Sequence, residues 1–165
     1  MKCVKRKSQA GKRILVFISD EKETDMRLLL AIDDSKFSEA ATQAVVARYQ
    51  PKDTEIHILN AVDLALPIPT SYAVAFREES LRQGQELVQR AEQTLSKAGF
   101  KVQTVVEEGD PKTKILDHAA QWKPDIIVLG SHGRKGATHF LMGSVSEAVM
   151  RHAPCSVEVV RTPKG

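Results

Sequence analysis

The chain has 165 residues, of which 42% are apolar and 5% aromatic, and its formal net charge is +3. This length suits one domain with a core of Val, Ile, Leu and Ala, and no apolar run reaches the roughly 20 residues that cross a bilayer. The apolar stretch 14–18 is too short for the core of a signal peptide, and Cys3 and Cys155 form neither a C-x-x-C pair nor a disulfide framework. We therefore expect a cytoplasmic protein without a membrane segment.

The positive charge is concentrated at the N-terminus. Residues 1–13 carry six basic and no acidic side chains, whereas residues 26–165 carry 17 of each. We predict a basic leader and acidic linker over residues 1–25, with one extra strand near 13–20, followed by a compact domain over 26–165. Because the domain itself is neutral, the charge gives little reason to expect a nucleic-acid partner, although a basic arm that touches phosphate or membrane is an alternative to a solvated tail.

Strand and helix patterns alternate from Met26 onward. The first strand is apolar throughout, as in a strand buried on both faces of a parallel sheet, and Pro51, Pro111 and Pro124 mark element boundaries. Gly99 is predicted to end the longest helix. The predicted strands are 28–32, 56–62, 102–106, 125–129 and 156–161, and the helical segments are 37–48, 81–98, a segment from Pro111 to Ala120, and 144–152.

This alternation predicts a doubly wound α/β sandwich in three layers around a five-stranded parallel sheet, Rossmann-like or flavodoxin-like, with strand order 3-2-1-4-5. The last strand alternates polar and apolar residues, so we place it at the border of the sheet. Ligands of such sheets bind in the crevice at the carboxyl ends of the central strands.

A glycine-rich segment follows the fourth strand, and the last helix opens with Gly143 and Ser144. Backbone N–H groups in such a loop and at a helix start can bind an anion, and Ser144, Ser146 and Arg134 would add polar donors. The segment is neither a Walker P-loop nor a G-x-G-x-x-G fingerprint. A loop whose glycines only permit turns is the alternative.

The spacing Gly130-x2-Gly133-x9-Gly143-Ser144 resembles the G-2x-G-9x-G-(S/T) signature of the universal stress protein family, in its ATP-binding subgroup. The resemblance extends from Met26 to Arg161. It includes the segments 30–35, 109–111, 124–133 and 151–157 in the same order.

The resemblance implies an ATP site, with Mg²⁺ bound through the phosphates rather than by the protein alone. The acid that ends the first strand would contact adenine and lie near the ribose, the second strand would pack against adenine, and the glycine segment would hold ribose and phosphates. The residues at these positions are Asp33, Ala61, Val62, Leu129, Gly130, Ser131, Gly133, Arg134, Gly143, Ser144, Val145 and Ser146. Two positions depart from the family pattern, Asn60 in place of a frequent His and Asp34 in place of a frequent Gly, and Asp34 adds negative charge near the phosphates.

Several of these residues have simpler structural interpretations. Asp33 can cap the first helix, and His132 can be a hydrogen-bonded loop histidine rather than a metal ligand or general base. Cys155 and Trp122 are expected to be packing residues.

The expected function is adenine-nucleotide binding by a stress-response domain without an evident catalytic constellation. The alternatives are a slow ATPase, an enzyme such as a nucleotidyl transferase on the same sheet, and a nucleotide-independent dimeric interaction module. The resemblance also implies a homodimer formed through the last strand, from Ser156 to Arg161, which could pair along its edge.

Overall fold

The computed structural model describes residues 2–7, 13–18, 26–64, 70–133 and 142–162. Its centre is a parallel sheet of five strands in the order β5-β4-β3-β6-β7, which confirms the predicted order 3-2-1-4-5. The β7 strand lies at one edge of the sheet, as its alternating pattern predicted. The strands are β3 (Met26–Ala31), β4 (Thr54–Val62), β5 (Lys101–Glu108), β6 (Ile126–Gly130) and β7 (Ser156–Val160).

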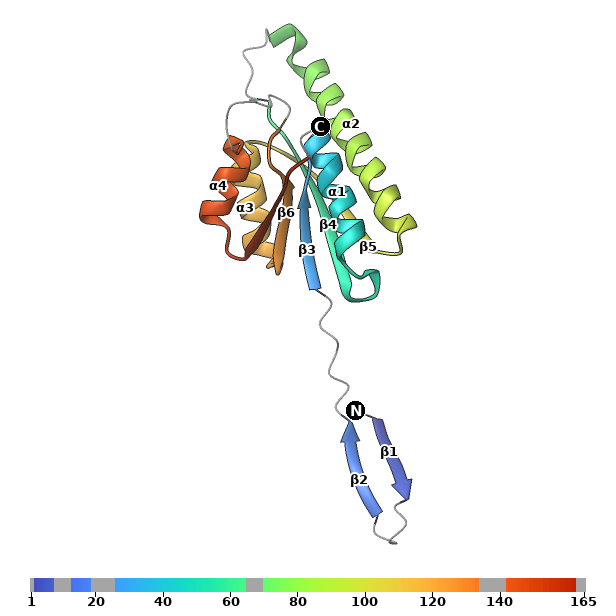
Figure 1. The fold of residues 1–165 in the computed structure, drawn as a ribbon. Helices are drawn as coiled ribbons and strands as arrows, with labels where there is room; N and C mark the ends of the chain where they lie inside the picture. The colour runs from blue at the N-terminus through green and yellow to red at the C-terminus, as the bar shows by residue number, and fades with distance from the viewer. Residues whose placement is uncertain (1, 8–12, 19–25, 65–69, 134–141, 163–165) are drawn as a thin grey trace.

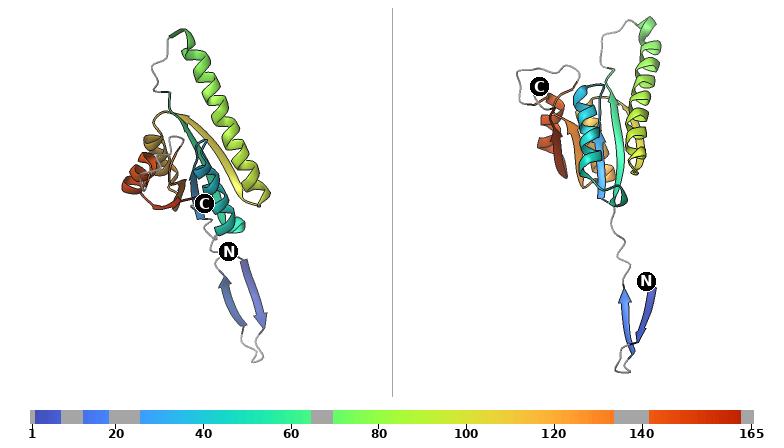
Figure 2. Two further views of the ribbon diagram at one scale, coloured as in Figure 1. Left: turned by 45° about the horizontal axis from the view of Figure 1, so that its top comes forward. Right: turned by 45° about the vertical axis from the view of Figure 1, so that its right-hand side comes forward.

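Helices cover both faces of this sheet (Figures 1 and 2). One face is covered by α1 (Lys36–Arg48) and α2 (Thr70–Lys97), and the other by α3 (Pro111–Trp122) and α4 (Ser144–His152). A short 3-10 helix, η1 (Pro51–Asp53), leads into β4. The predicted three-layer α/β architecture is confirmed.

The central strand β3 serves two hydrophobic cores at once. Leu28 and Leu30 belong to the core under α1 and α2, whereas Leu29 belongs to the core under α3 and α4. All three side chains are fully buried. This explains why the strand is apolar at consecutive positions instead of alternating.

Side-chain caps fix the starts of two helices. Ser35 caps α1 by accepting a hydrogen bond from the Ser38 amide, and Asp110 caps α3 by accepting one from the Thr113 amide at 3.1 Å, with Pro111 in the first turn. Gly99 follows the C-terminal end of α2 and adopts a φ of +95°, which agrees with its predicted role in ending the helix.

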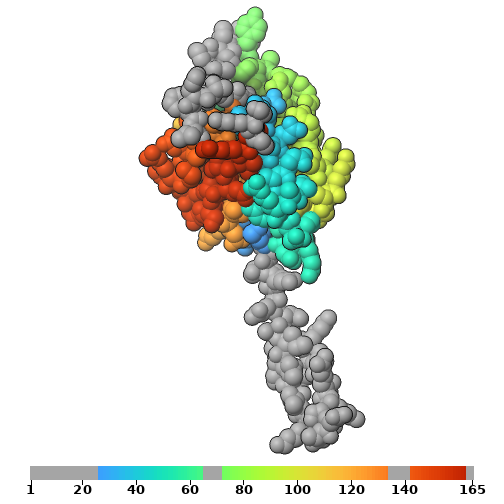
Figure 3. Space-filling view, viewed as in Figure 1, coloured from blue at the N-terminus to red at the C-terminus, as the bar shows by residue number. Residues whose placement is uncertain are grey.

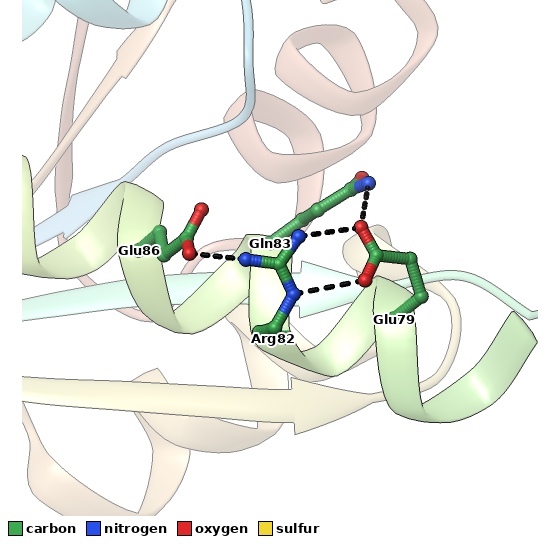
Figure 4. A network of polar contacts seen from close by, with 4 residues as sticks. All are labelled: Glu79, Arg82, Gln83 and Glu86. Atoms are coloured by element: carbon green, nitrogen blue, oxygen red, sulfur yellow. Dashed lines mark hydrogen bonds and ion pairs between the residues drawn. The ribbon is translucent and has the colours of Figure 1, made fainter. Parts of the chain in front are cut away.

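The helix α2 is 28 residues long and begins at Thr70, well ahead of residue 81, where the predicted segment begins. Its N-terminal half projects past the carboxyl ends of the strands (Figure 1). Solvated ion pairs lie along this half: Arg82 donates hydrogen bonds to Glu79 and Glu86, and Gln83 also donates to Glu79 (Figure 4). The hydrogen bonds that Glu79 accepts from Arg82 and Gln83 lower its pKa to about 2. No helix in the described ranges is both long and apolar enough to cross a membrane.

The N-terminal region contains two strands, β1 (Lys2–Lys7) and β2 (Arg13–Ile18), which pair as an antiparallel hairpin. The strand predicted near 13–20 is therefore present as β2. The β1 strand was not predicted, because its basic composition favours a solvated tail. The hairpin forms a sheet of its own and does not extend the five-stranded sheet.

A cluster of aromatic rings lies between the sheet and α3. The ring of His57 on β4 stacks on Trp122 with 3.6 Å between centroids, and its Nδ1 lies 3.1 Å from Nε2 of His118. Glu107 lies 3.6 Å from Nδ1 of His118. Trp122 is thus a packing residue, as predicted, whereas the burial of His57 was not anticipated.

Burial, followed by the neighbouring His118, lowers the pKa of His57 below its ordinary value. In the unfolded chain His57 titrates near pH 6.5, so it takes up a proton at a pH where the folded protein does not. The free energy of unfolding should therefore fall as the pH decreases through 6.5 towards the pKa of the folded state.

His57→Phe tests this effect, because it keeps a ring against Trp122 and removes the titrating group. When the pH is lowered from 7.5 to 5.5, we expect the Tm of this variant to fall less than the Tm of the wild type. The control is His152→Gln, which replaces an exposed histidine on α4. A His57→Phe profile parallel to that of the wild type would contradict the assignment.

Candidate functional site

A cavity of about 910 Å³ opens at the carboxyl ends of β3, β4 and β6. Its walls also include the inner side of α2 and the first residues of α3 and α4. This is the point of the sheet where the strand order reverses and where α/β proteins of this type bind their ligands. The volume lies within the range of small-molecule sites.

The cavity brings together ten of the twelve residues that the sequence assigned to a ligand. Ser131 does not line the cavity, and Arg134 lies outside the described residues. The ten lining residues are Asp33, Ala61, Val62, Leu129, Gly130, Gly133, Gly143, Ser144, Val145 and Ser146.

The carboxylate of Asp33 is held by the first turn of α1. The hydroxyls of Ser35 and Ser38 donate to its Oδ1 at 2.6 and 2.7 Å, and its own amide donates to the Ser38 hydroxyl at 2.8 Å. Ser35, rather than Asp33, caps the helix. The structure therefore fixes the orientation of a half-buried acid at the cavity wall, which suits an acceptor for hydroxyl or amine donors on a ligand.

Glycines at the end of β6 allow backbone segments to approach closely. A Cβ at Gly130 would lie 2.7 Å from the backbone carbon of Phe37 in α1, and a Cβ at Gly133 would lie 2.8 Å from Oδ2 of Asp33. A Cβ at Gly143 would lie 3.2 Å from Cα of His132. Part of the glycine spacing is thus required by the fold itself, independently of any ligand.

Hydrogen bonds to Ser131 join the end of β6 to the start of α4. The carbonyl of Ser131 accepts from the Gly143 amide at 2.8 Å and from the Ser146 hydroxyl at 3.0 Å, and its own amide donates to the Val160 carbonyl. Ser131 and Ser146 are 1% and 2% exposed. The Ser146 hydroxyl, which we expected to contact a phosphate, is therefore engaged within the protein, and only its amide is left for that role.

The start of α4 differs from the starts of α1 and α3. Its N-cap is Gly143, which supplies no side-chain hydrogen bond, whereas Ser35 and Asp110 supply one to the other two helices. The first amides of a helix have no partner within the helix, so those of Ser144, Val145 and Ser146 need an acceptor from elsewhere. These residues line the cavity, where an anion would meet both these amides and the positive end of the helix dipole.

Several lining residues were not predicted from the sequence. They include Asn60, which is buried on β4, Lys112 at the start of α3, and a face of α2. The residues from α2 are Phe76, Ser80, Gln83, Gly84, Glu86, Leu87 and Arg90. Of these residues, the sequence placed only Gly84 on the inner face of the helix, and Phe76 and Ser80 precede the helical segment 81–98 that we predicted.

A serine and a histidine lie next to each other at the end of β6. The Ser131 hydroxyl is 3.1 Å from Nδ1 of His132, whose ring packs against Phe37. Because Ser131 is buried and does not line the cavity, this pair has the geometry of a structural contact rather than of an accessible nucleophile.

Within the described ranges, no group of three or more His, Cys, Asp or Glu side chains could hold a metal ion. Burial also raises the pKa of the Cys155 thiol, which packs against the core under α3 and α4.

Comparison with known proteins identifies the domain that contains this cavity. The model of the universal stress protein family matches residues 26–161. A protein of Staphylococcus aureus (strain USA300) assigned to the universal stress proteins is 35% identical over 144 residues, which cover 84% of this chain and 86% of the relative.

Solved structures show the same fold. The universal stress protein UspA from Lactobacillus plantarum has a TM-score of 0.71 and 26% identity over 83% of this chain and 98% of its own. A universal stress protein from Arabidopsis thaliana, solved with AMP bound, has a TM-score of 0.65 and 17% identity over 84% of this chain and 92% of its own. Together with the match over residues 26–161, these similarities show that the chain belongs to the universal stress protein family.

Proposed function

We propose that this protein binds an adenine nucleotide, ATP together with Mg²⁺, in the cavity at the carboxyl ends of β3, β4 and β6. The observation that carries the proposal is the start of α4 beside the cavity, where the N-cap Gly143 supplies no side-chain hydrogen bond to the first amides of the helix. The Arabidopsis relative with bound AMP supports an adenine nucleotide as the ligand. The bound nucleotide would act as a signal in a stress response, in the cytoplasm.

The two ends of the cavity suit the two ends of a nucleotide. The amides at the start of α4 suit the phosphates, because they donate hydrogen bonds and add the positive end of a helix dipole. The carboxylate of Asp33 suits the hydroxyls of the ribose. Ala61 and Val62 at the end of β4 offer apolar surface to a base.

The charges around the cavity favour a nucleotide that arrives with a cation. Described acidic residues outnumber basic ones, and the basic residues are Arg90 and Lys112. Arg90 lies 4.0 Å from Asp34, an exposed pair whose mutual attraction is weak in water. The acidic residues are Asp33, Asp34, Asp63, Glu86, Asp110 and Glu147. Mg²⁺ on the phosphates would lower the repulsion between this lining and ATP.

The ligand class can be tested by thermal unfolding in the presence of ATP, with and without Mg²⁺, beside AMP, cyclic AMP and GTP. A ligand at 100 times its Kd adds about 2.7 kcal/mol to the stability of the folded state. For a domain of this size we expect a rise in Tm of about 5–10 °C with ATP and Mg²⁺, and a smaller rise without Mg²⁺. If nucleotide-free protein showed no shift with any of the adenine nucleotides, the proposal would be wrong.

Gly143→Asp tests the phosphate end of the cavity. An Asp at this N-cap would bond the amides of α4 with its own carboxylate and would repel phosphate, so we expect affinity for ATP to fall at least about tenfold, or 1.4 kcal/mol. Gly143→Ala is the matched control. It introduces the same Cβ, 3.2 Å from His132 Cα, without the carboxylate.

The two variants are compared by calorimetric titration. We expect Gly143→Ala to retain most of the affinity and the Tm of Gly143→Asp without ligand to be no lower than that of Gly143→Ala. Equal affinities in the two variants would remove the start of α4 from the site.

We further propose that two copies of the chain pair through the open edge of β7. The Val160 carbonyl bonds to the Ser131 amide on the β6 side, so the backbone groups of Val157 and Val159 point to the open edge, because these groups alternate along a strand. Figure 3 shows β7 and α1 side by side at the molecular surface, where Tyr49 donates a hydrogen bond to Glu158 at 2.6 Å. This contact holds the edge strand against α1.

Val157→Pro tests this interface, because proline removes the amide at the open edge. The matched control is Val157→Thr, which has a similar shape and keeps the amide. Both substitutions replace a side chain that packs against the core under α3 and α4. A difference between the two variants therefore reports the missing amide rather than the lost packing. By light scattering we expect a dimer for the wild type and for Val157→Thr and a monomer for Val157→Pro. A dimeric Val157→Pro variant that remains folded would place the interface elsewhere.

A further inference from the structure

The side-chain amide of Asn60 is fixed in the wall of the cavity between β4 and α2. Asn60 is 6% exposed, and its Nδ2 donates a hydrogen bond to the Ile32 carbonyl at 2.9 Å. A carbonyl oxygen only accepts, so this bond determines which end of the amide is the nitrogen. The oxygen, Oδ1, must then be the other end.

This oxygen points towards α2 at Gly84. A Cβ at Gly84 would lie 2.7 Å from Oδ1, and both Asn60 and Gly84 line the cavity. Within the described part of the chain, no hydrogen bond to Oδ1 is seen, and Oδ1 is not one of the fully buried polar atoms that lack a partner. Solvent therefore reaches this oxygen, and Asn60 lines the cavity. An acceptor held in one orientation at the cavity wall is available to a donor on a ligand.

The surroundings of Asn60 indicate what kind of ligand carries this donor. Next to Oδ1, a Cβ at Gly84 would also lie 3.1 Å from Val62 Cγ2 and 3.2 Å from Val106 Cγ1, so the acceptor has apolar neighbours. A fixed acceptor beside apolar surface suits a flat heterocycle that has a donor on its edge. The 6-amino group of adenine is such a donor, whereas the 6-oxo group of guanine or hypoxanthine is an acceptor and would face Oδ1 unfavourably.

We propose that Asn60 selects 6-amino purines by accepting a hydrogen bond from the exocyclic amine, with the Ile32 carbonyl as the group that holds its orientation. Gly84 contributes to this selectivity, because a side chain at this position would occupy the space next to Oδ1 of Asn60. This inference rests on the proposed nucleotide site and adds the group that distinguishes one purine from another.

The test compares ATP with ITP, which has the same ribose and phosphates but a 6-oxo group, by calorimetric titration with Mg²⁺. For the wild type we expect ATP to bind at least about tenfold more tightly than ITP, since sites built to pair with a polar group reject analogues that lack it. For Asn60→Leu, which has a similar volume and no acceptor, we expect the ratio to fall towards one. N6,N6-dimethyl-ATP, which has no N6 hydrogen, should lose affinity for the wild type but not for Asn60→Leu.

Gly84→Ala keeps the proposal testable if Asn60→Leu fails to fold, because it leaves Asn60 in place and crowds Oδ1. It should also reduce the ratio of ATP to ITP affinity, whereas Gln85→Ala, at an exposed neighbouring position on α2, should leave the ratio unchanged.

The outcomes separate this inference from the proposed function. Equal binding of ATP and ITP by the wild type, or an unchanged ratio in Asn60→Leu, would overturn the role of Asn60 and leave nucleotide binding intact. An absence of binding by any adenine nucleotide would overturn both.

Discussion

The close approach of backbone segments at the carboxyl end of β6 is the constraint on which the rest of the site depends. Gly130 lets the first turn of α1 lie against the strand, and Gly143 lets the chain return to the Ser131 carbonyl. A Cβ at Gly130 would overlap the backbone of Phe37, whereas a Cβ at Gly143 could be accommodated by a shift of a few tenths of an ångström. Gly130 is therefore required first by the packing of the chain against itself, and the cavity exists because this packing leaves the start of α4 beside the strand ends.

The sequence predicts the sheet well because the signals are local and strong. Consecutive apolar residues in β3 and β6, with prolines and glycines between elements, determine where the elements lie, and the right-handed crossover rule then limits their order. The β1 strand was missed because its residues are mostly basic. Its strand state comes from pairing with β2, which composition does not reveal.

The site is predicted less completely than the fold, for a physical reason. The spacing of glycines identifies positions near a ligand, but it does not say which polar groups the protein already uses. The Ser146 hydroxyl bonds to the Ser131 carbonyl and is no longer available, whereas the oxygen of Asn60 on β4 accepts no hydrogen bond from the described residues. Whether a polar group is already bonded within the protein depends on partners that are far apart in the sequence. For Asn60, the position of its oxygen is known only once α2 lies beside β4.

The glycine at the start of α4 has a consequence beyond the cavity. This helix is only nine residues long and leads through Pro154 directly into the edge strand β7. Short helices are marginal without a cap, so a phosphate bound at the amides would serve as the cap that the sequence omits. A ligand in that position would stabilise the start of α4 and, because β7 follows the helix directly, would also stabilise the edge strand. Binding of a nucleotide at the cavity would then change the stability of the border of the sheet.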